Sequence, residues 1–318
     1  MTLRLELIVL AVATVLVACR GAADDPVGTT TSTTTTTTTA EDAGPLPGLR
    51  IATFNVRRYF DTVCDSGDCS YGAYEEQPTQ AQFEARTAQI AEAIERIDAS
   101  IVLLQEVETW TCLLSLASAL YPRYPTFRLG EIGGVATVDV AVLAEGELVD
   151  EIRHRQVPLP LPSGGFTSFA RELLELHLEV DGQRVVVFDA HFKSKSGDDP
   201  ERRLAEATAA HQIVTARAAQ LPDALVVLGG DLNDVPGSPP LDAIEQGGLL
   251  HRVAADIPDG LDHTFIFDGQ GVALDHLYLA VAAGGSYIAG SAEVIRGSAG
   301  GLGGSDHAAV AAHFELPE

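Results

Sequence analysis

The sequence predicts an α/β domain over residues 47–318. Short runs rich in Val, Ile and Leu alternate there with longer stretches whose apolar residues recur at helical spacing. No linker or internal repeat interrupts this alternation, so we expect one domain. The predicted strands are 49–55, 101–105, 137–143, 171–180, 184–190, 225–229, 274–280 and 308–314.

Two helices are predicted between these strands, at residues 79–97 and 201–219. Each has apolar residues on one helical face, as Ile90, Ile94 and Ile97 show in the first. Such a face is expected to pack against a sheet.

The chain is strongly acidic. It has 20 Lys and Arg residues against 45 Asp and Glu residues, which gives a formal net charge of −25. This balance excludes a broad basic surface for holding nucleic acid. A phosphate ligand must therefore be held by a few cations or by a bound metal ion.

The first 46 residues predict export and anchoring. Residues 7–18 are apolar, too short for an ordinary membrane span and suited to a signal-peptide core. The LVAC segment that ends at Cys19 resembles the lipobox of bacterial lipoproteins, in which the cysteine is lipidated and becomes the mature N-terminus. The alternative is an ordinary secretory signal.

We therefore expect a signal peptide at 1–18 and a lipidated Cys19 that begins a disordered tether, 19–46, which includes TTTSTTTTTTT. The folded domain would then lie outside the cytoplasm, at the cell surface or in the periplasm.

Three cysteines fall within the predicted domain. In an oxidising compartment Cys64 and Cys69 can close a short loop and leave Cys112 as a buried apolar residue. Pairing of either one with Cys112 is the alternative.

Polar residues lie at or beside the ends of the predicted strands at six places. Any one of them is an ordinary turn residue by itself, but the ordered set is hard to explain by turns alone. In α/β enzymes such strand-end groups gather into a site. The residues are Asn55, Glu106, His191, Asp231 with Asn233, Asp275, and Asp306 with His307.

This ordered set, with its GDLND, LDH and SDH motifs, resembles the endonuclease/exonuclease/phosphatase superfamily. That superfamily includes pancreatic-type deoxyribonucleases, abasic-site repair endonucleases, bacterial sphingomyelinases and inositol polyphosphate 5-phosphatases. The resemblance covers residues 47–318. It implies two packed β-sheets flanked by helices, a four-layer sandwich.

The resemblance also implies a metal site. Glu106 matches the family's metal-binding glutamate, and Asn55 and Asp306 match the residues that complete the site. Asp231 matches the carboxylate that positions or deprotonates the attacking water, or binds a second metal. Asn233 matches its phosphate-bonding neighbour. The expected ion is Mg²⁺ or Mn²⁺, with Ca²⁺ as an alternative structural or second ion.

Two histidines have expected roles. His307 matches the essential histidine and Asp275 its carboxylate partner, which fixes the tautomer of the ring. His191 matches the second histidine of deoxyribonuclease-like members, and its carboxylate partner aligns with Asp139.

Two cations are candidate phosphate ligands. Arg171 matches a phosphate-contacting arginine of deoxyribonuclease-like members, with a surface strand arginine as the alternative. Lys193 follows His191 closely and, with Lys195, is one of only two lysines in the chain. The alternative for both lysines is a solvated loop.

The sequence therefore predicts a divalent-metal-dependent phosphodiester hydrolase, an extracytoplasmic nuclease acting as a monomer on nucleic acid or another phosphodiester. The runner-up is a phosphatase or phosphodiesterase that acts on small or lipid phosphates. A catalytically dead binding module would lack a metal or base residue, and none is missing. No PAWCDR-like segment or long apolar hairpin is present, which disfavours inositol polyphosphate 5-phosphatase and secreted sphingomyelinase activities.

Lipidation at Cys19 can be tested by labelling cells with a clickable fatty acid. The wild-type chain should be labelled and Cys19→Ala should not, because the variant lacks the acceptor thiol. Equal labelling of both proteins would show that Cys19 is not the lipidated residue.

Overall fold

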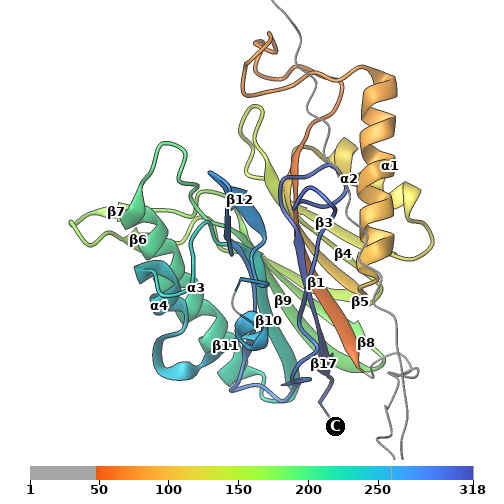
Figure 1. The fold of residues 1–318 in the computed structure, drawn as a ribbon. Coiled ribbons are helices and arrows are strands. Elements are labelled where there is room, and N and C mark those ends of the chain that lie inside the picture. Colours follow the sequence, from red (N-terminus) through yellow and green to blue (C-terminus); the bar gives the residue numbers. More distant parts are fainter. Residues whose placement is uncertain (1–47, 259, 318) are drawn as a thin grey trace, which may run out of the picture. The chain divides into compact units, whose positions relative to one another are not determined.

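The computed structural model describes residues 48–258 and 260–317 (Figure 1). The predicted signal peptide, Cys19 and the Thr-rich tether lie outside these described residues. Within them, no helix is long and apolar enough to cross a membrane.

Two mixed β-sheets form the centre of the domain. The first has seven strands in the order β15-β17-β1-β2-β4-β3, with β16 also paired to β17. Its strands are β1 (Leu49–Tyr59), β2 (Ile101–Val107), β3 (Thr126–Gly130), β4 (Asp139–Ala144), β15 (Ser286–Tyr287), β16 (Glu293–Ile295) and β17 (Ala309–Glu315).

The second sheet has six strands in the order β11-β14-β10-β9-β8-β5. They are β5 (Glu147–Arg153), β8 (Leu173–Val180), β9 (Gln183–His191), β10 (Ala224–Asp231), β11 (Leu250–Arg252) and β14 (Asp275–Ala280). Two small hairpins complete the strands: β6 (Leu159–Pro160) with β7 (Phe166–Thr167), and β12 (Phe265–Phe267) with β13 (Gln270–Val272).

Helices cover the outer faces of both sheets (Figure 1). The first sheet carries α1 (Gln80–Ile97) and α2 (Trp110–Ala119), and the second carries α3 (Pro200–Gln220) and α4 (Pro239–Ile244). Two short 3₁₀ helices, η1 (Gln246–Gly248) and η2 (Val253–Asp256), follow α4. The predicted fold, two packed β-sheets with helices outside, is confirmed.

Side-chain alternation along the strands builds the layers. In β1, Ile51 packs between the two sheets, whereas Phe54 packs beneath α1. In β10, Val227 packs between the sheets and Leu228 beneath α3. One apolar core thus joins the sheets, and a further core lies under the helices on each side.

Local sequence explains where the two predicted helices begin. Thr79 caps α1 in a reciprocal capping box with Gln82, and the Asp199 side chain accepts from the Arg202 amide at the start of α3. Both helices and all eight strands are confirmed, with ends that differ by a few residues.

The edge strand β5 was not predicted. Most of its side chains are exposed or half-buried on both faces, so its sequence lacks the alternation that identifies a half-buried strand.

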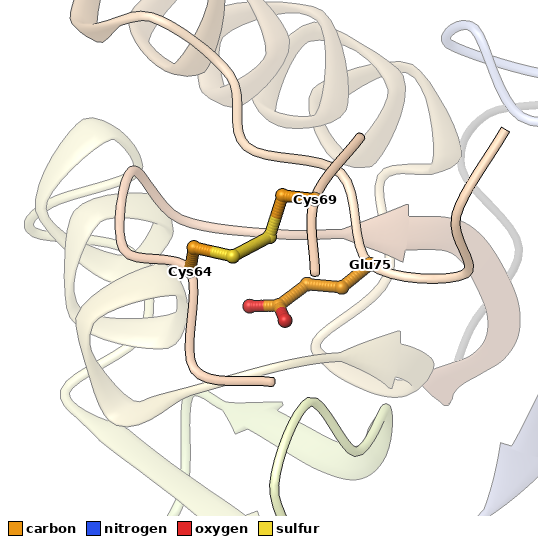
Figure 2. A group of neighbouring side chains, drawn as sticks. All are labelled: Cys64, Cys69 and Glu75. Atoms are coloured by element: carbon orange, nitrogen blue, oxygen red, sulfur yellow. A yellow bond between two sulfur atoms is a disulfide. The ribbon is translucent and has the colours of Figure 1, made fainter. Parts of the chain in front are cut away.

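The cysteine pairing is also resolved. A disulfide joins Cys64 to Cys69 (Figure 2). Cys112 is buried without a disulfide partner. The structure thus selects the short-loop alternative.

Candidate active site

The strands that carry most of the predicted site residues end on the same side of the two sheets. Strands β1 and β2 are parallel, as are β9 and β10, so each pair ends on the same side. Strand β14 runs antiparallel to β10 and begins where β10 ends, which places Asp275 directly opposite Asp231. Because the sheets pack face to face, residues from both can reach one another at this edge.

The same alternation that builds the core turns the polar side chains inward. Ile51 and Asn55 lie four positions apart in β1, on the face toward the second sheet, and Val227 and Asp231 are related in the same way in β10. The site is therefore the polar end of the layer between the sheets.

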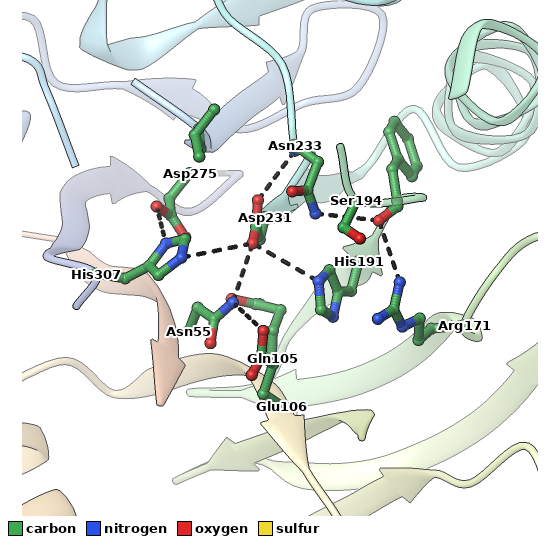
Figure 3. Close-up of polar contacts among 12 residues, drawn as sticks. Asn55, Gln105, Glu106, Arg171, His191, Ser194, Asp231, Asn233, Asp275 and His307 are labelled. Carbon is green, nitrogen blue, oxygen red and sulfur yellow. Dashed lines mark hydrogen bonds and ion pairs between the residues drawn. The ribbon is translucent and has the colours of Figure 1, made fainter. Parts of the chain in front are cut away.

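Asp231 lies at the centre of the polar contacts (Figure 3). Its Oδ2 atom accepts a hydrogen bond from Asn55 Nδ2 at 2.9 Å. The same oxygen lies 3.6 Å from His191 Nε2 and 3.9 Å from His307 Nε2. Burial, and then the charge of Asp275, raise the pKa of Asp231 to about 7.

His307 and Asp275 form a buried pair. The Nδ1 atom of His307 is 2.8 Å from Asp275 Oδ2, and the Phe265 ring lies 4.9 Å from the imidazole. Burial lowers the pKa of His307, but the Asp275 carboxylate outweighs it and raises the pKa to about 10. The sequence prediction that these two side chains can bond is confirmed.

Glu106 offers a carboxylate suited to a metal ion. It accepts from the Arg58 amide at 2.8 Å and from Asn55 Nδ2 at 3.2 Å. Among the described residues, no Lys, Arg or His side chain forms an ion pair with it. Asp306 pairs instead with the exposed Arg57 at 3.4 Å. The Glu106 and Asp306 carboxylates are hard donors of the kind that Mg²⁺ prefers. The amide oxygen of Asn55 instead accepts from the Arg57 amide at 2.8 Å.

The predicted pair of His191 and Asp139 does not form. The Asp139 carboxylate accepts from Thr137 Oγ1 at 3.1 Å and from the Ile132 amide at 3.4 Å. His191 Nδ1 is buried with no hydrogen-bond partner among the described residues. Asp139 begins β4, and its carboxylate is used to hold the β3–β4 loop.

The phosphate-binding candidates differ in their surroundings. Arg171 lies beside the site, where its Nη1 is 3.5 Å from the Phe192 carbonyl oxygen (Figure 3). That oxygen also accepts from Asn233 Nδ2 at 3.1 Å. Lys193 donates to the carbonyls of Ser194 and Ser196 in its own loop. These contacts favour Arg171 as a phosphate ligand. For Lys193 they favour the alternative, a residue of a solvated loop.

Sequence analysis missed the polar contacts beneath the site. Gln105 donates to Thr53 at 3.0 Å and to Asp189 at 2.7 Å, and all three are fully buried. Since Gln105 and Asp189 belong to different sheets, this contact ties the sheets together below Glu106 and His191. The sequence contained a signal for this contact, because Gln105 and Asp189 are polar residues at core-facing positions of otherwise apolar strands.

Two packed sheets lie between outer helices, and carboxylates and imidazoles gather where the central strands end. This arrangement is expected of a hydrolytic enzyme. The family model described as "Endonuclease/Exonuclease/phosphatase family" matches residues 52–307, and the chain belongs to this family. Its members are phosphoric ester hydrolases that depend on divalent metal ions. A search of curated protein sequences finds no match.

Solved structures resemble this chain at low sequence identity. D. rerio TDP2, complexed with a single-strand DNA product, is 15% identical with a TM-score of 0.59. Sphingomyelinase C from Streptomyces griseocarneus is 19% identical with a TM-score of 0.57. A beta toxin mutant from Staphylococcus aureus, with bound magnesium ions, is 16% identical with a TM-score of 0.55. Each alignment covers 84% of this chain and 99% of the other, and shows the shared fold.

The burial of the Asp139 carboxyl group predicts how the free energy of unfolding depends on pH. Burial raises the pKa of Asp139 from 3.8 to about 7. Its protonated form therefore favours folding, an effect that is complete below pH 4 and lost as pH rises to 7. Thermal unfolding should show Asp139→Asn more stable than wild type at pH 8, with no difference below pH 4. The exposed Asp223→Asn should match wild type throughout, and an unchanged pH profile in Asp139→Asn would contradict the shift.

The bonded pair predicts non-additive losses of activity. His307→Ala should lower turnover of bis-p-nitrophenyl phosphate by about 10²-fold or more, because a positioned acid or base contributes that much. Adding Asp275→Ala to it should cost far less than Asp275→Ala costs alone, since the carboxylate acts through the ring. Steady-state kinetics of the four proteins in Mg²⁺ measure this. Additive losses, or an active His307→Ala enzyme, would rule the pair out.

Proposed function

We propose that this chain is a divalent-metal-dependent nuclease that hydrolyses phosphodiester bonds outside the cytoplasm. One observation carries the proposal. Asn55, His191 and His307 converge on the Asp231 carboxylate, with Asp275 behind His307 and Glu106 bonded to Asn55 (Figure 3). In this proposal, an anionic substrate and a water molecule react beside the Asp231 carboxylate.

Asp231 is the group best suited to take a proton from the attacking water. Its pKa near 7 lets the carboxylate act as a base at neutral pH. Asn55 donates to the same oxygen and orients it.

His307 supplies a positive charge. Asp275 holds Nδ1 as the protonated nitrogen and leaves Nε2 toward the site. With a pKa of about 10, the ring is an imidazolium at neutral pH and can donate to a phosphate oxygen as negative charge develops.

Glu106, completed by Asn55 and Asp306, would hold the metal ion. When bound, Mg²⁺ or Mn²⁺ neutralises charge on the phosphate oxygens. The magnesium-bound beta toxin structure supports this choice of ion.

The neighbouring structures bear on the substrate. The DNA product held by D. rerio TDP2 supports nucleic acid. The sphingomyelinase neighbour supports the second candidate, a phosphodiesterase for lipid or other small phosphates.

Residues 1–46 support the location and the anchor. The apolar segment and LVAC motif favour a lipoprotein held at the membrane by Cys19. The fatty-acid labelling of Cys19→Ala tests this part, and the mass of the purified chain in solution tests the expected monomer.

The activity itself is tested with the purified full chain on single-stranded DNA, RNA, bis-p-nitrophenyl phosphate and sphingomyelin. Cleavage of DNA or RNA should require Mg²⁺ and stop with EDTA. Glu106→Gln keeps the side-chain shape but removes its charge, so it should need far more Mg²⁺ and lose at least about tenfold in rate.

The matched control is Glu147→Gln, which alters an exposed glutamate of β5 and should behave as wild type. Hydrolysis of sphingomyelin without nucleic acid cleavage would replace the nuclease with the second candidate. Wild-type Mg²⁺ dependence in Glu106→Gln would exclude Glu106 as a ligand.

A further inference from the structure

The loop 60–79, between β1 and α1, is fixed in place beside the site. We call it the stapled loop because the Cys64–Cys69 disulfide closes its first half. The buried Glu75 side chain lies beside this disulfide (Figure 2). Its carboxylate accepts from the Asp65 and Ser66 amides at 2.6 and 2.7 Å. The residue before Glu75 is therefore held in one position.

That preceding residue is Tyr74, an aromatic side chain that is 50% exposed. The Arg58 guanidinium lies 4.9 Å from the centre of its ring, and the Phe60 ring meets it edge-on at 6.0 Å. Burial raises the pKa of Tyr74, the Glu106 carboxylate raises it further, and Arg171 opposes them. Because the backbone amide of Arg58 donates to Glu106 at 2.8 Å, the Tyr74 ring beside Arg58 lies near the candidate metal ligand.

A pocket of about 570 Å³ is lined by Arg58 and Phe60, the two residues whose side chains contact the Tyr74 ring. Its lining includes three guanidinium groups, on Arg57, Arg58 and Arg86, and one carboxylate, Glu76, among the described residues. The Arg86 side chain donates to the carbonyls of Val56 and Gly303. In a chain of net charge −25, this local excess of positive charge favours an anionic ligand.

Arg58 both contacts the Tyr74 ring and lines the pocket. Its backbone amide donates to Glu106 at 2.8 Å, and its side chain, 42% exposed, forms a long ion pair of 4.0 Å with the exposed Glu76. The backbone at Arg57 and Arg58 has φ of 54° and 42°. Non-glycine residues adopt such angles at a cost, which the surrounding structure must offset.

We propose that Arg58 and Tyr74 form a subsite for the nucleotide next to the scissile bond of a single-stranded nucleic acid. This inference rests on the proposed nuclease function. Arg58 binds the flanking phosphate, and the exposed part of the Tyr74 ring stacks on the base, which must be unpaired to reach it. The same guanidinium groups repel a choline head group, which carries a positive charge, and so disfavour sphingomyelin.

The test compares one substrate that has a flanking nucleotide with one that has none. These are a 12-nucleotide single-stranded DNA and bis-p-nitrophenyl phosphate, assayed with the purified full chain in Mg²⁺. For Arg58→Gln and Tyr74→Leu, the ratio of kcat/KM on DNA to kcat/KM on the small diester should fall at least tenfold. Tyr74→Phe should keep most of the ratio, because it keeps the ring.

Salt dependence gives a second measurement. Arg58→Gln should reduce the slope of log kcat/KM against log salt by about one on DNA, as expected for one lost phosphate contact. The control Arg184→Gln removes an exposed arginine at the opposite end of β9 and should match wild type on both substrates.

The outcomes separate the subsite from the nuclease function. Equal losses on both substrates, or equal effects of Arg58→Gln and Arg184→Gln, would overturn the subsite while the nuclease stands. A wild-type enzyme that cleaves the small diester or sphingomyelin vesicles but no nucleic acid would overturn the nuclease function and the subsite with it. A preference for duplex over single-stranded DNA would also overturn the stacking role of Tyr74.

Discussion

Asp231 places a carboxylate where little water reaches, 2% exposed between two sheets. A buried charge costs several kcal/mol unless it is paired, hydrogen-bonded or protonated. Here the Asn55 amide and two imidazoles face it, and its pKa is raised. The residues that offset the cost of burying the Asp231 carboxylate are also those that would carry out the reaction. The stability of the site and its reactivity therefore depend on the same contacts.

The sheets can bring these groups together only because the backbone at this edge is unusual. Gly230 precedes Asp231 with φ of 147°, and a Cβ atom there would lie 1.9 Å from the Ala190 carbonyl oxygen. No other residue fits this approach of β10 to β9. Glu106 and Asn233 also have positive φ, 67° and 53°. The chain thus leaves regular strand geometry at the point where its side chains turn toward the site.

Local chemistry limited what could be predicted about particular residues. Asp275 and His307 lie in recognisable motifs, and the structure pairs them at 2.8 Å. Asp139 has no motif around it, and its expected bond to His191 was wrong because a carboxylate at a strand start can equally hold the adjacent loop. Lys193 also has no motif around it and stays a prediction, with its ammonium group bonded to two carbonyls of its own loop in this structure.

The sequence by itself determined the eight main strands, the helices α1 and α3, and the order of polar residues at the strand ends. These follow from periodicity and from residue chemistry, which are local properties. Tertiary structure alone decided other contacts: Gln105 with Asp189 across the two sheets, and Arg58 with Tyr74 beside the site. The first contact joins residues 84 positions apart and depends on how the sheets pack, and the second depends on the fold of the loop that the disulfide closes.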